Sequence, residues 1–251
     1  MPIKLEICLS GIDSAIAAQE GGADRVELCE NLIEGGTTPS QGTIAVVREH
    51  LDIDIMVMVR PRGGDFLYTA LEFEVMKQDV KLMHQHGVTG VVFGLLNPNG
   101  TIDKARTAEL IDLAGERQVT FHRAFDMTRD PYEALDDLLE LGVQHILTSG
   151  QALTAIQGLD VIAELQKRAG DALTIMPAAN VTAANARHIV ETANLREIHV
   201  GSNTKTQVTS GMTYQNKDAA MGDDTTLPEY TMPYTSALLV RKVVEAVQGI
   251  D

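Results

Sequence analysis

The sequence predicts an α/β protein folded as a single (β/α)8 TIM-type barrel, and three observations support this fold class. Eight short apolar runs alternate with eight amphipathic stretches along 251 residues, and eight strand–helix units in about 250 residues are typical of a closed barrel. The apolar runs are nearly continuous, as expected of strands that are buried on both faces. The competing fold, an open doubly wound sheet, usually carries a glycine-rich phosphate turn after its first strand. Here that position reads Ser10-Gly11-Ile12-Asp13.

The individual elements follow from hydrophobic periodicity and from the residues that start and stop helices. In chain order, strands are expected at Lys4–Leu9, Arg25–Cys29, Ile53–Arg60, Gly90–Gly94, Val119–Arg123, His145–Ser149, Leu173–Pro177 and Glu197–Gly201. Helices are expected at Asp13–Glu20, Thr43–His50, Leu71–His86, Asp103–Ala114, Pro131–Leu141, Ala155–Ala169, Ala183–Ala193 and Ser236–Val247. The segment Asp130-Pro131-Tyr132-Glu133 shows the punctuation clearly, with an N-cap aspartate, a first-turn proline and a first-turn glutamate.

The sequence shows no linker and no second domain, so residues 1–251 are expected to form one barrel domain. One segment departs from the regular alternation. Residues 202–235 are polar and rich in Thr, Asp, Asn and Gly, and they are expected to form a long loop after the eighth strand. A final helix is expected at residues 236–248.

Composition narrows the function classes. There are 20 Lys and Arg against 35 Asp and Glu, which gives a formal net charge of −15 and argues against binding of a phosphate backbone. No apolar run approaches the ~20 residues that span a bilayer, and the first six residues do not resemble a signal peptide. Two cysteines are too few for a disulfide framework. We therefore expect a soluble cytoplasmic protein that binds neither nucleic acid nor membrane.

Ionisable side chains gather where the expected strands end, which is where barrel proteins carry their chemistry. The residues selected on this ground are Glu6, Cys8, Glu27, Cys29, Arg60, Arg62, His122, Asp126, Thr148 and His199. Glu6, Glu27, His122 and Asp126 are candidates for proton transfer, and Thr148 and His199 are candidates for ligand binding. Buried charges need partners, so the same set is also compatible with a structural layer of ion pairs that fills the mouth of the barrel.

The two cysteines end neighbouring strands. Adjacent strands lie about 4.8 Å apart, which brings two thiols within reach of one soft ion. Cu(I) prefers thiolate ligands, whereas a structural zinc site normally has four ligands and Cys-x-x-Cys spacing. Cys8 and Cys29 are thus candidates for a Cu(I) site, with apolar packing as the alternative.

Two arginines follow the third strand in Arg60-Pro61-Arg62-Gly63-Gly64-Asp65-Phe66. Guanidinium groups beside a Gly-Gly turn suit a carboxylate or phosphate, so Arg60 and Arg62 are candidates for an anion clamp. In the alternative interpretation, one arginine pairs with Glu6 or Glu27 and the other faces solvent. No lysine lies at the carboxyl end of an expected strand, so a Schiff-base mechanism has no evident residue.

Several motifs together resemble the CutC family of copper homeostasis proteins. They are Glu27-Leu28-Cys29, Glu34-Gly35-Gly36-Thr37-Thr38-Pro39-Ser40, Arg60-Pro61-Arg62-Gly63-Gly64-Asp65-Phe66, Val91-Val92-Phe93-Gly94, Thr120-Phe121-His122-Arg123-Ala124-Phe125-Asp126 and Leu147-Thr148-Ser149-Gly150-Gln151. The resemblance runs from about residue 3 to residue 201. It implies a TIM-type barrel, a homodimer or larger homo-oligomer, a cytoplasmic location, and copper binding with Cys8 and Cys29 as Cu(I) ligands.

Three hypotheses for function follow. The first is a cytoplasmic copper homeostasis protein that binds Cu(I) through Cys8 and Cys29. The alternative is a barrel enzyme of unknown reaction that acts on a small anionic substrate at the carboxyl-end mouth. In a third, the ionisable mouth is structural and the function lies in protein–protein contact.

Overall fold

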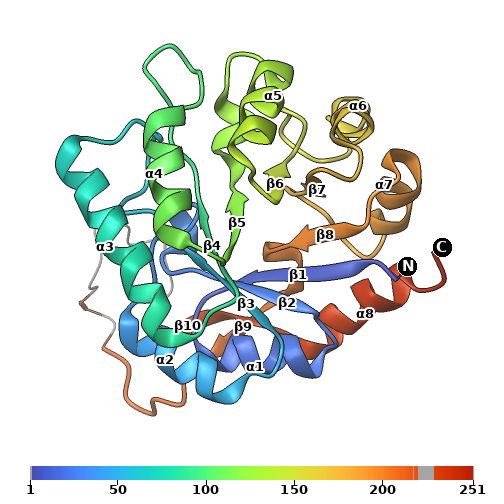
Figure 1. Cartoon of the computed structure of the whole chain (residues 1–251). Coiled ribbons are helices and arrows are strands. Elements are labelled where there is room, and N and C mark those ends of the chain that lie inside the picture. The colour runs from blue at the N-terminus through green and yellow to red at the C-terminus, as the bar shows by residue number, and fades with distance from the viewer. Residues whose placement is uncertain (1, 217, 220–228, 251) are drawn as a thin grey trace.

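The computed structural model describes residues 2–216, 218–219 and 229–250. Its centre is an eight-stranded parallel sheet, and Figure 1 shows helices surrounding these strands. The strands are β1 (Lys4–Leu9), β2 (Arg25–Leu28), β3 (Asp54–Met58), β4 (Gly90–Phe93), β5 (Gln118–Phe121), β6 (His145–Thr148), β7 (Thr174–Pro177) and β8 (Glu197–Val200). Their order in the sheet is β7-β6-β5-β4-β3-β2-β1-β8, and β7 lies against β8, so the sheet forms a nearly closed barrel. The predicted fold class is confirmed.

Helices alternate with the strands, as predicted. They are α1 (Ile12–Glu20), α2 (Gln41–His50), α3 (Ala70–His86), α4 (Lys104–Ala114), α5 (Pro131–Leu141), α6 (Leu159–Ala169), α7 (Ala186–Ala193) and α8 (Ala237–Val247). The α5 cap is as expected, since the Asp130 side chain accepts from the backbone N–H groups of Tyr132 and Glu133. None of the described helices is both long and apolar enough to cross a membrane.

Two helices begin later than predicted because the preceding residues make other contacts. The backbone N–H of Ala155 donates to Ala179 O at 3.0 Å, in the loop after β7, and α6 begins only at Leu159. The side chain of Asn185 accepts from the backbone N–H of Thr182 at 2.7 Å, which places Asn185 at the N-cap of α7. Contacts between loops thus override local helix propensity here.

The segment 202–235, expected to form a long polar loop, contains two strands in its described part. Strands β9 (Lys205–Thr209) and β10 (Thr231–Thr235) form an antiparallel pair with Thr209 opposite Thr231. The pair lies against α1, where the N–H of Thr235 donates to Ser14 Oγ at 3.2 Å. Both strands are rich in threonine, whose β-branched side chain suits a strand. Residues 217 and 220–228 of the segment lie outside the described residues.

The barrel separates two apolar regions. The larger one lies between the sheet and the helices and takes in Ile7, Val26 and Val91. The smaller one fills the barrel interior and is rich in sulfur, with the buried residues Cys29, Met56, Met58, Val92, Leu147, Met176 and Ala178. The alternation of Met56 and Met58 on β3 therefore marks positions that face the interior, as core residues should. The ionisable side chains of the strand ends lie around this interior region.

Candidate metal centre and mouth pocket

The two thiols meet at the carboxyl end of the barrel. In the β1–β2 register Cys8 is opposite Glu27, so Cys29 lies two residues further along its chain. Strands of a barrel are tilted and staggered, which brings side chains of different register positions to the same height. The two Sγ atoms are 4.0 Å apart, and Cys29 is fully buried while Cys8 is partly buried.

Two more potential ligands lie beside the thiols. Atoms of Cys8, Glu27 and His199 that are able to bind a metal lie within 4.8 Å of one another. The Cys29 thiol is also 3.6 Å from Glu27 Oε2, and His199 Nε2 is 3.9 Å from the same oxygen. The structure therefore brings Cys8, Glu27 and His199 together, and Cys29 joins this group through its contacts with Cys8 and Glu27.

A buried chain of charges fixes the imidazole. His199 Nδ1 is 2.7 Å from Glu6 Oε1, and the other oxygen of Glu6 accepts from Arg25 Nε at 2.5 Å. Burial opposes ionisation of Glu6, but the charge of Arg25 and the contact with His199 lower the pKa of Glu6 well below its usual range. Ionised Glu6 can only accept a hydrogen bond, so Nδ1 of His199 donates and Nε2 faces Glu27 and Cys8.

Protonation differs across the cluster. A hydrogen bond from Cys29, aided by His199, lowers the pKa of the Cys8 thiol, whereas donation to Cys8 and burial raise the pKa of Cys29. Burial and the neighbouring Cys8 raise the pKa of Glu27. Burial alone would lower the pKa of His199, but the carboxyl group of Glu27 and the contacts with Cys8 and Glu6 raise it. The lowered pKa of Cys8 and the raised pKa of His199 together favour a thiolate beside an imidazolium in the metal-free protein.

Below the thiols lies an ion-pair floor centred on Arg25, which is not among the residues selected from the strand ends. Arg25 is completely buried and contacts Glu6, Glu197 at 2.6 Å and the Met176 sulfur at 2.9 Å. His145 Nε2 is 3.6 Å from Glu197. A signal was present in the sequence: Arg25 is two residues before Glu27, and side chains two apart on a strand share a face.

Arg60 organises the loops around the mouth. Its guanidinium donates to three backbone carbonyls, Glu34 O, Gly36 O and Gly64 O, each at 2.8 Å. The structure does not bring Arg62 into the same place. Arg62 pairs with Glu72 at 2.6 Å and with Asp65 at 3.1 Å on the exposed side of the loop.

His122 follows the end of β5, whereas the two cysteines come from β1 and the end of β2. Its Nδ1 accepts from the backbone N–H of Ala124 at 3.1 Å, and its ring lies 4.9 Å from that of Phe66. Burial and the charge of Arg60 lower the pKa of His122 to about 3. His122 is therefore a neutral imidazole with its proton on Nε2, and that atom is buried without a hydrogen-bond partner among the described residues.

Asp126 is fully occupied by neighbouring groups. It accepts from Thr148 Oγ1 at 2.6 Å, from the N–H and hydroxyl of Ser149, each at 3.0 Å, and from Arg123 Nε at 2.8 Å. Thr148 is thereby directed toward Asp126. Asp126 and Thr148 hold the ends of β5 and β6 together.

A pocket of about 280 Å³ opens over these groups. Six of the residues selected from the sequence line it: Cys8, Glu27, Arg60, His122, Asp126 and His199. Its apolar wall comes from Met58, Phe66, Met127 and Leu147. Of the other selected residues, Cys29 and Glu6 contact the lining residues from below, Thr148 contacts Asp126, and Arg62 stays outside.

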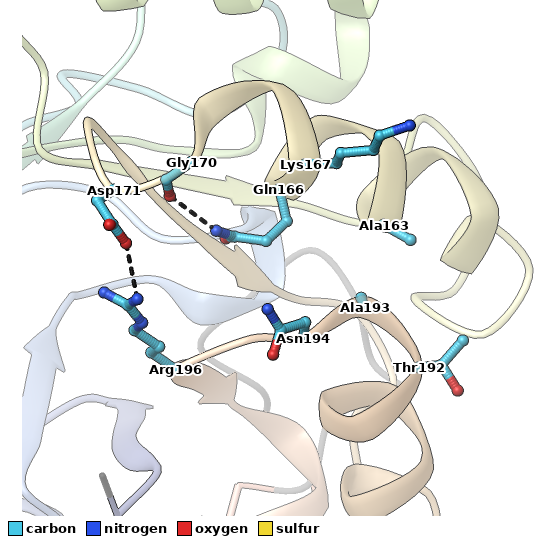
Figure 2. A pocket seen from close by; sticks show the side chains of 9 residues that line it. All are labelled: Ala163, Gln166, Lys167, Gly170, Asp171, Thr192, Ala193, Asn194 and Arg196. Atoms are coloured by element: carbon cyan, nitrogen blue, oxygen red, sulfur yellow. Dashed lines mark hydrogen bonds and ion pairs between the residues drawn. The ribbon is translucent and has the colours of Figure 1, made fainter. Parts of the chain in front are cut away.

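A second hollow, of about 480 Å³, lies at the opposite end of the barrel between α6 and α7. Figure 2 shows Arg196 reaching Asp171 across it, with the two atoms 2.7 Å apart. Both side chains are more than half exposed, as is Lys167. This hollow lacks the buried ionisable groups of the mouth. Exposed ion pairs of this kind contribute little to the stability of the fold.

Fold and site together define the class: a (β/α)8 barrel with two thiols, an imidazole and a buried acid–base network at its carboxyl-end mouth. The CutC family model matches residues 3–204. A CutC family protein of Chromobacterium violaceum is 47% identical over 96% of this chain and 97% of its own length. The human copper homeostasis protein cutC homolog is 43% identical over 94% of this chain and 86% of its own length. A solved CutC structure from Streptococcus agalactiae superimposes with a TM-score of 0.76 at 32% identity, covering 79% of this chain and 98% of that one. The chain belongs to the CutC family.

Proposed function

We propose that this chain is a copper homeostasis protein that binds one Cu(I) ion between Cys8 and Cys29. The observation that carries the proposal is the 4.0 Å separation of the two sulfurs. A metal–thiolate bond is about 2.3 Å long in zinc sites, so one ion between two sulfurs needs a separation of up to about 4.6 Å. A small side-chain adjustment meets this requirement. The relatives whose names refer to copper homeostasis support the same role.

The donor set suits a soft ion. Two thiolates and an imidazole are ligands that Cu(I) accepts readily, and His199 Nε2 is directed to the thiols by its bond to Glu6. A carboxylate behind a metal-bound histidine fixes the orientation of the ring and raises its basicity. Glu27 is the least suited donor of the four, because burial and the neighbouring Cys8 raise its pKa and so disfavour the carboxylate form. We therefore assign Cys8, Cys29 and His199 as the ligands.

Copper binding must release protons. The raised pKa values of Cys29 and His199 mean that both groups hold a proton in the metal-free protein. Both protons leave when the ion binds, so the apparent affinity for Cu(I) should fall as the pH is lowered. Cys8 contributes less to this dependence because its pKa is already lowered.

The proposal also includes a cytoplasmic location and assembly into a homo-oligomer. Two thiols at 4.0 Å persist as thiols most readily in a reducing compartment, which supports the cytoplasm. A homodimer or larger homo-oligomer agrees with large apolar side chains that remain exposed on the single chain, such as Ile33, Leu71 and Leu153. Light scattering at two protein concentrations measures the assembly directly.

Anaerobic titration of the reduced protein with Cu(I), in competition with a chromophoric chelator, tests the proposal. The wild type should take up one equivalent per chain. Cys8→Ser and Cys29→Ser should each lose most of the affinity, and His199→Asn should lose less. His188→Asn, which removes an exposed histidine from α7, is the matched control and should bind as the wild type does. Full, stoichiometric affinity in the double cysteine variant would refute the assignment.

A second candidate function is a barrel enzyme that acts on a small anionic substrate. The observation that favours it is the pocket of about 280 Å³ directly above the Cys8–His199 pair. A thiolate beside an imidazolium is the arrangement of a nucleophilic cysteine. This function needs a substrate site in the pocket.

A further inference from the structure

The mouth pocket contains a buried positive charge that no carboxylate neutralises. Arg60 is 96% buried, since only 4% of it is exposed, and among the described residues it forms no ion pair. Its guanidinium donates to backbone carbonyls, which carry no net charge. A buried charge without a counter-charge is costly. An anion in the pocket would supply that counter-charge.

One hydrogen-bond donor in the same pocket has no partner. His122 is only 4% exposed, its Nδ1 accepts from Ala124, and its Nε2 carries the proton but contacts no acceptor in the part of the chain that the structure describes. The His122 ring lies against the Phe66 ring, and the Arg60 guanidinium lies over the same Phe66 ring, 5.1 Å from its centroid. An oxygen of the ligand would satisfy this N–H.

One acceptor also lacks a partner. Glu27 is 2% exposed, and its Oε1 atom makes no hydrogen bond to any described residue while Oε2 faces Cys29 and His199. A buried polar atom of this kind normally has a partner. A hydroxyl or amino group on the ligand would provide one.

Size and donor number favour a carboxylate over a phosphate. A volume of about 280 Å³ is at the small end for ligand pockets, and its apolar wall suits a compact hydrocarbon or aromatic group. Phosphate groups are usually held by several N–H donors or bidentate guanidinium contacts. Here the terminal nitrogens of Arg60 already donate to carbonyls, and His122 offers a single N–H. Arg123 also lines the pocket, but its guanidinium is engaged by Asp126 and Ser149.

We propose that the mouth pocket binds a small organic carboxylate that has an apolar body and a hydrogen-bond donor, with the carboxylate near Arg60 and His122 and the donor on Glu27. The proposed carboxylate is the substrate class of the second candidate function, the barrel enzyme. Its binding does not depend on copper. The ligand lies against the same Cys8 and His199 that we assign to the metal.

Calorimetric titration of the metal-free, reduced protein with mandelate tests the proposal, because mandelate joins a carboxylate, a hydroxyl and a phenyl ring. Phenylacetate lacks the hydroxyl and mandelamide lacks the charge, so both should bind at least about tenfold more weakly. Inorganic phosphate is the competing anion. Mandelate binding with the expected order of analogues supports the proposal. Tighter binding of phosphate, equal binding of mandelamide, or no binding of mandelate and phenylacetate overturns it.

Variants of His122 locate the site. In His122→Asn the amide oxygen can still accept from the Ala124 N–H, but the Nε2–H donor is lost, and mandelate binding should fall about tenfold or more. His122→Gln places an amide N–H near the Nε2 position and should recover part of the affinity. His84→Asn, at an exposed site on α3, is the control.

A shift of the His122 Nε2 resonance in the wild type on addition of mandelate gives a readout that no folding defect can produce. An unchanged resonance would contradict the proposal. Copper titration of the same samples separates this outcome from failure of the copper site.

Discussion

His199 donates from Nδ1 to Glu6 Oε1 at 2.7 Å, and this contact joins the ion-pair floor of the barrel to the thiols at its mouth. Glu6 is held by Arg25, and Arg25 is held in turn by Glu197. The orientation of a ligand at the mouth therefore depends on charges buried one layer below it. The sheet register produces this link, because Glu6 lies opposite both Arg25 and His199.

Replacing Glu6 should weaken copper binding although Glu6 does not touch the ion. In Glu6→Gln the neutral amide is a poorer acceptor for the His199 N–H, and loss of a carboxylate behind a metal-bound histidine typically costs about 10- to 100-fold in affinity. Competition titration with Cu(I) measures the change. Glu191→Gln, at an exposed position on α7, is the control. Unchanged affinity in Glu6→Gln would show that His199 does not bind the metal.

Removal of Arg25 should strongly destabilise the fold. Arg25→Met fills a similar volume but removes the buried guanidinium that Glu6 and Glu197 share, and Glu6 itself is only 1% exposed. Breaking one partner of a buried pair costs about 3–5 kcal/mol. Urea unfolding monitored by circular dichroism measures the loss, with the exposed Arg187→Met as control. A cost near that of the control would mean that the floor network contributes little.

His122 should make the protein less stable in mild acid. Its pKa is about 3 in the folded chain against a usual value of 6.5, so between these values the unfolded chain binds a proton that the folded chain does not. Stability therefore falls as the pH drops below about 6.5, by up to about 1.4 kcal/mol per pH unit from this one group. Other buried groups titrate as well, so the wild type is compared with His122→Asn. Between pH 6.5 and 4.5, the free energy of unfolding should fall less steeply in the variant than in the wild type. Parallel curves of unfolding free energy against pH would contradict the buried neutral imidazole.

Asp126 should prove to be a structural anchor. Asp126→Asn retains the size of the side chain but weakens its contacts with Thr148, Ser149 and Arg123. Hydrogen bonds to a charged group contribute about 1.5–3 kcal/mol each, so we expect a loss of at least about 1.5 kcal/mol in the free energy of unfolding. Cu(I) affinity should stay within about twofold of the wild type. A variant of full stability would argue instead for a role of Asp126 in ligand chemistry.

Much of this architecture was predictable from the sequence because local patterns determine it. Continuous apolar runs such as Val91-Val92-Phe93 mark buried strands, and the Asp130-Pro131 pair marks the start of α5. The thiol pair followed from the same reasoning, since strand order alone brings Cys8 beside Cys29. The β9–β10 pair was missed because its partners are more than twenty residues apart in a polar segment.

The contacts that each charged side chain makes were harder to predict than its place on a strand or loop. Arg60 and Arg62 look equivalent in the sequence, yet one is buried among carbonyls and the other lies outside the pocket. Their difference depends on which loop each side chain meets, and no local pattern encodes that. Arg25 was not predicted for another reason: it begins its strand, whereas the prediction rests on the residues where strands end. Its even spacing from Glu27 was the available signal.

X-ray absorption at the copper edge of the one-to-one Cu(I) complex tests the central claim most directly. Two sulfur neighbours and one imidazole nitrogen are predicted for the wild type, with the nitrogen lost in His199→Asn and the sulfurs lost in the double cysteine variant. A first shell of nitrogen and oxygen alone, or a spectrum that is unaffected by replacing Cys8 and Cys29, would contradict the account.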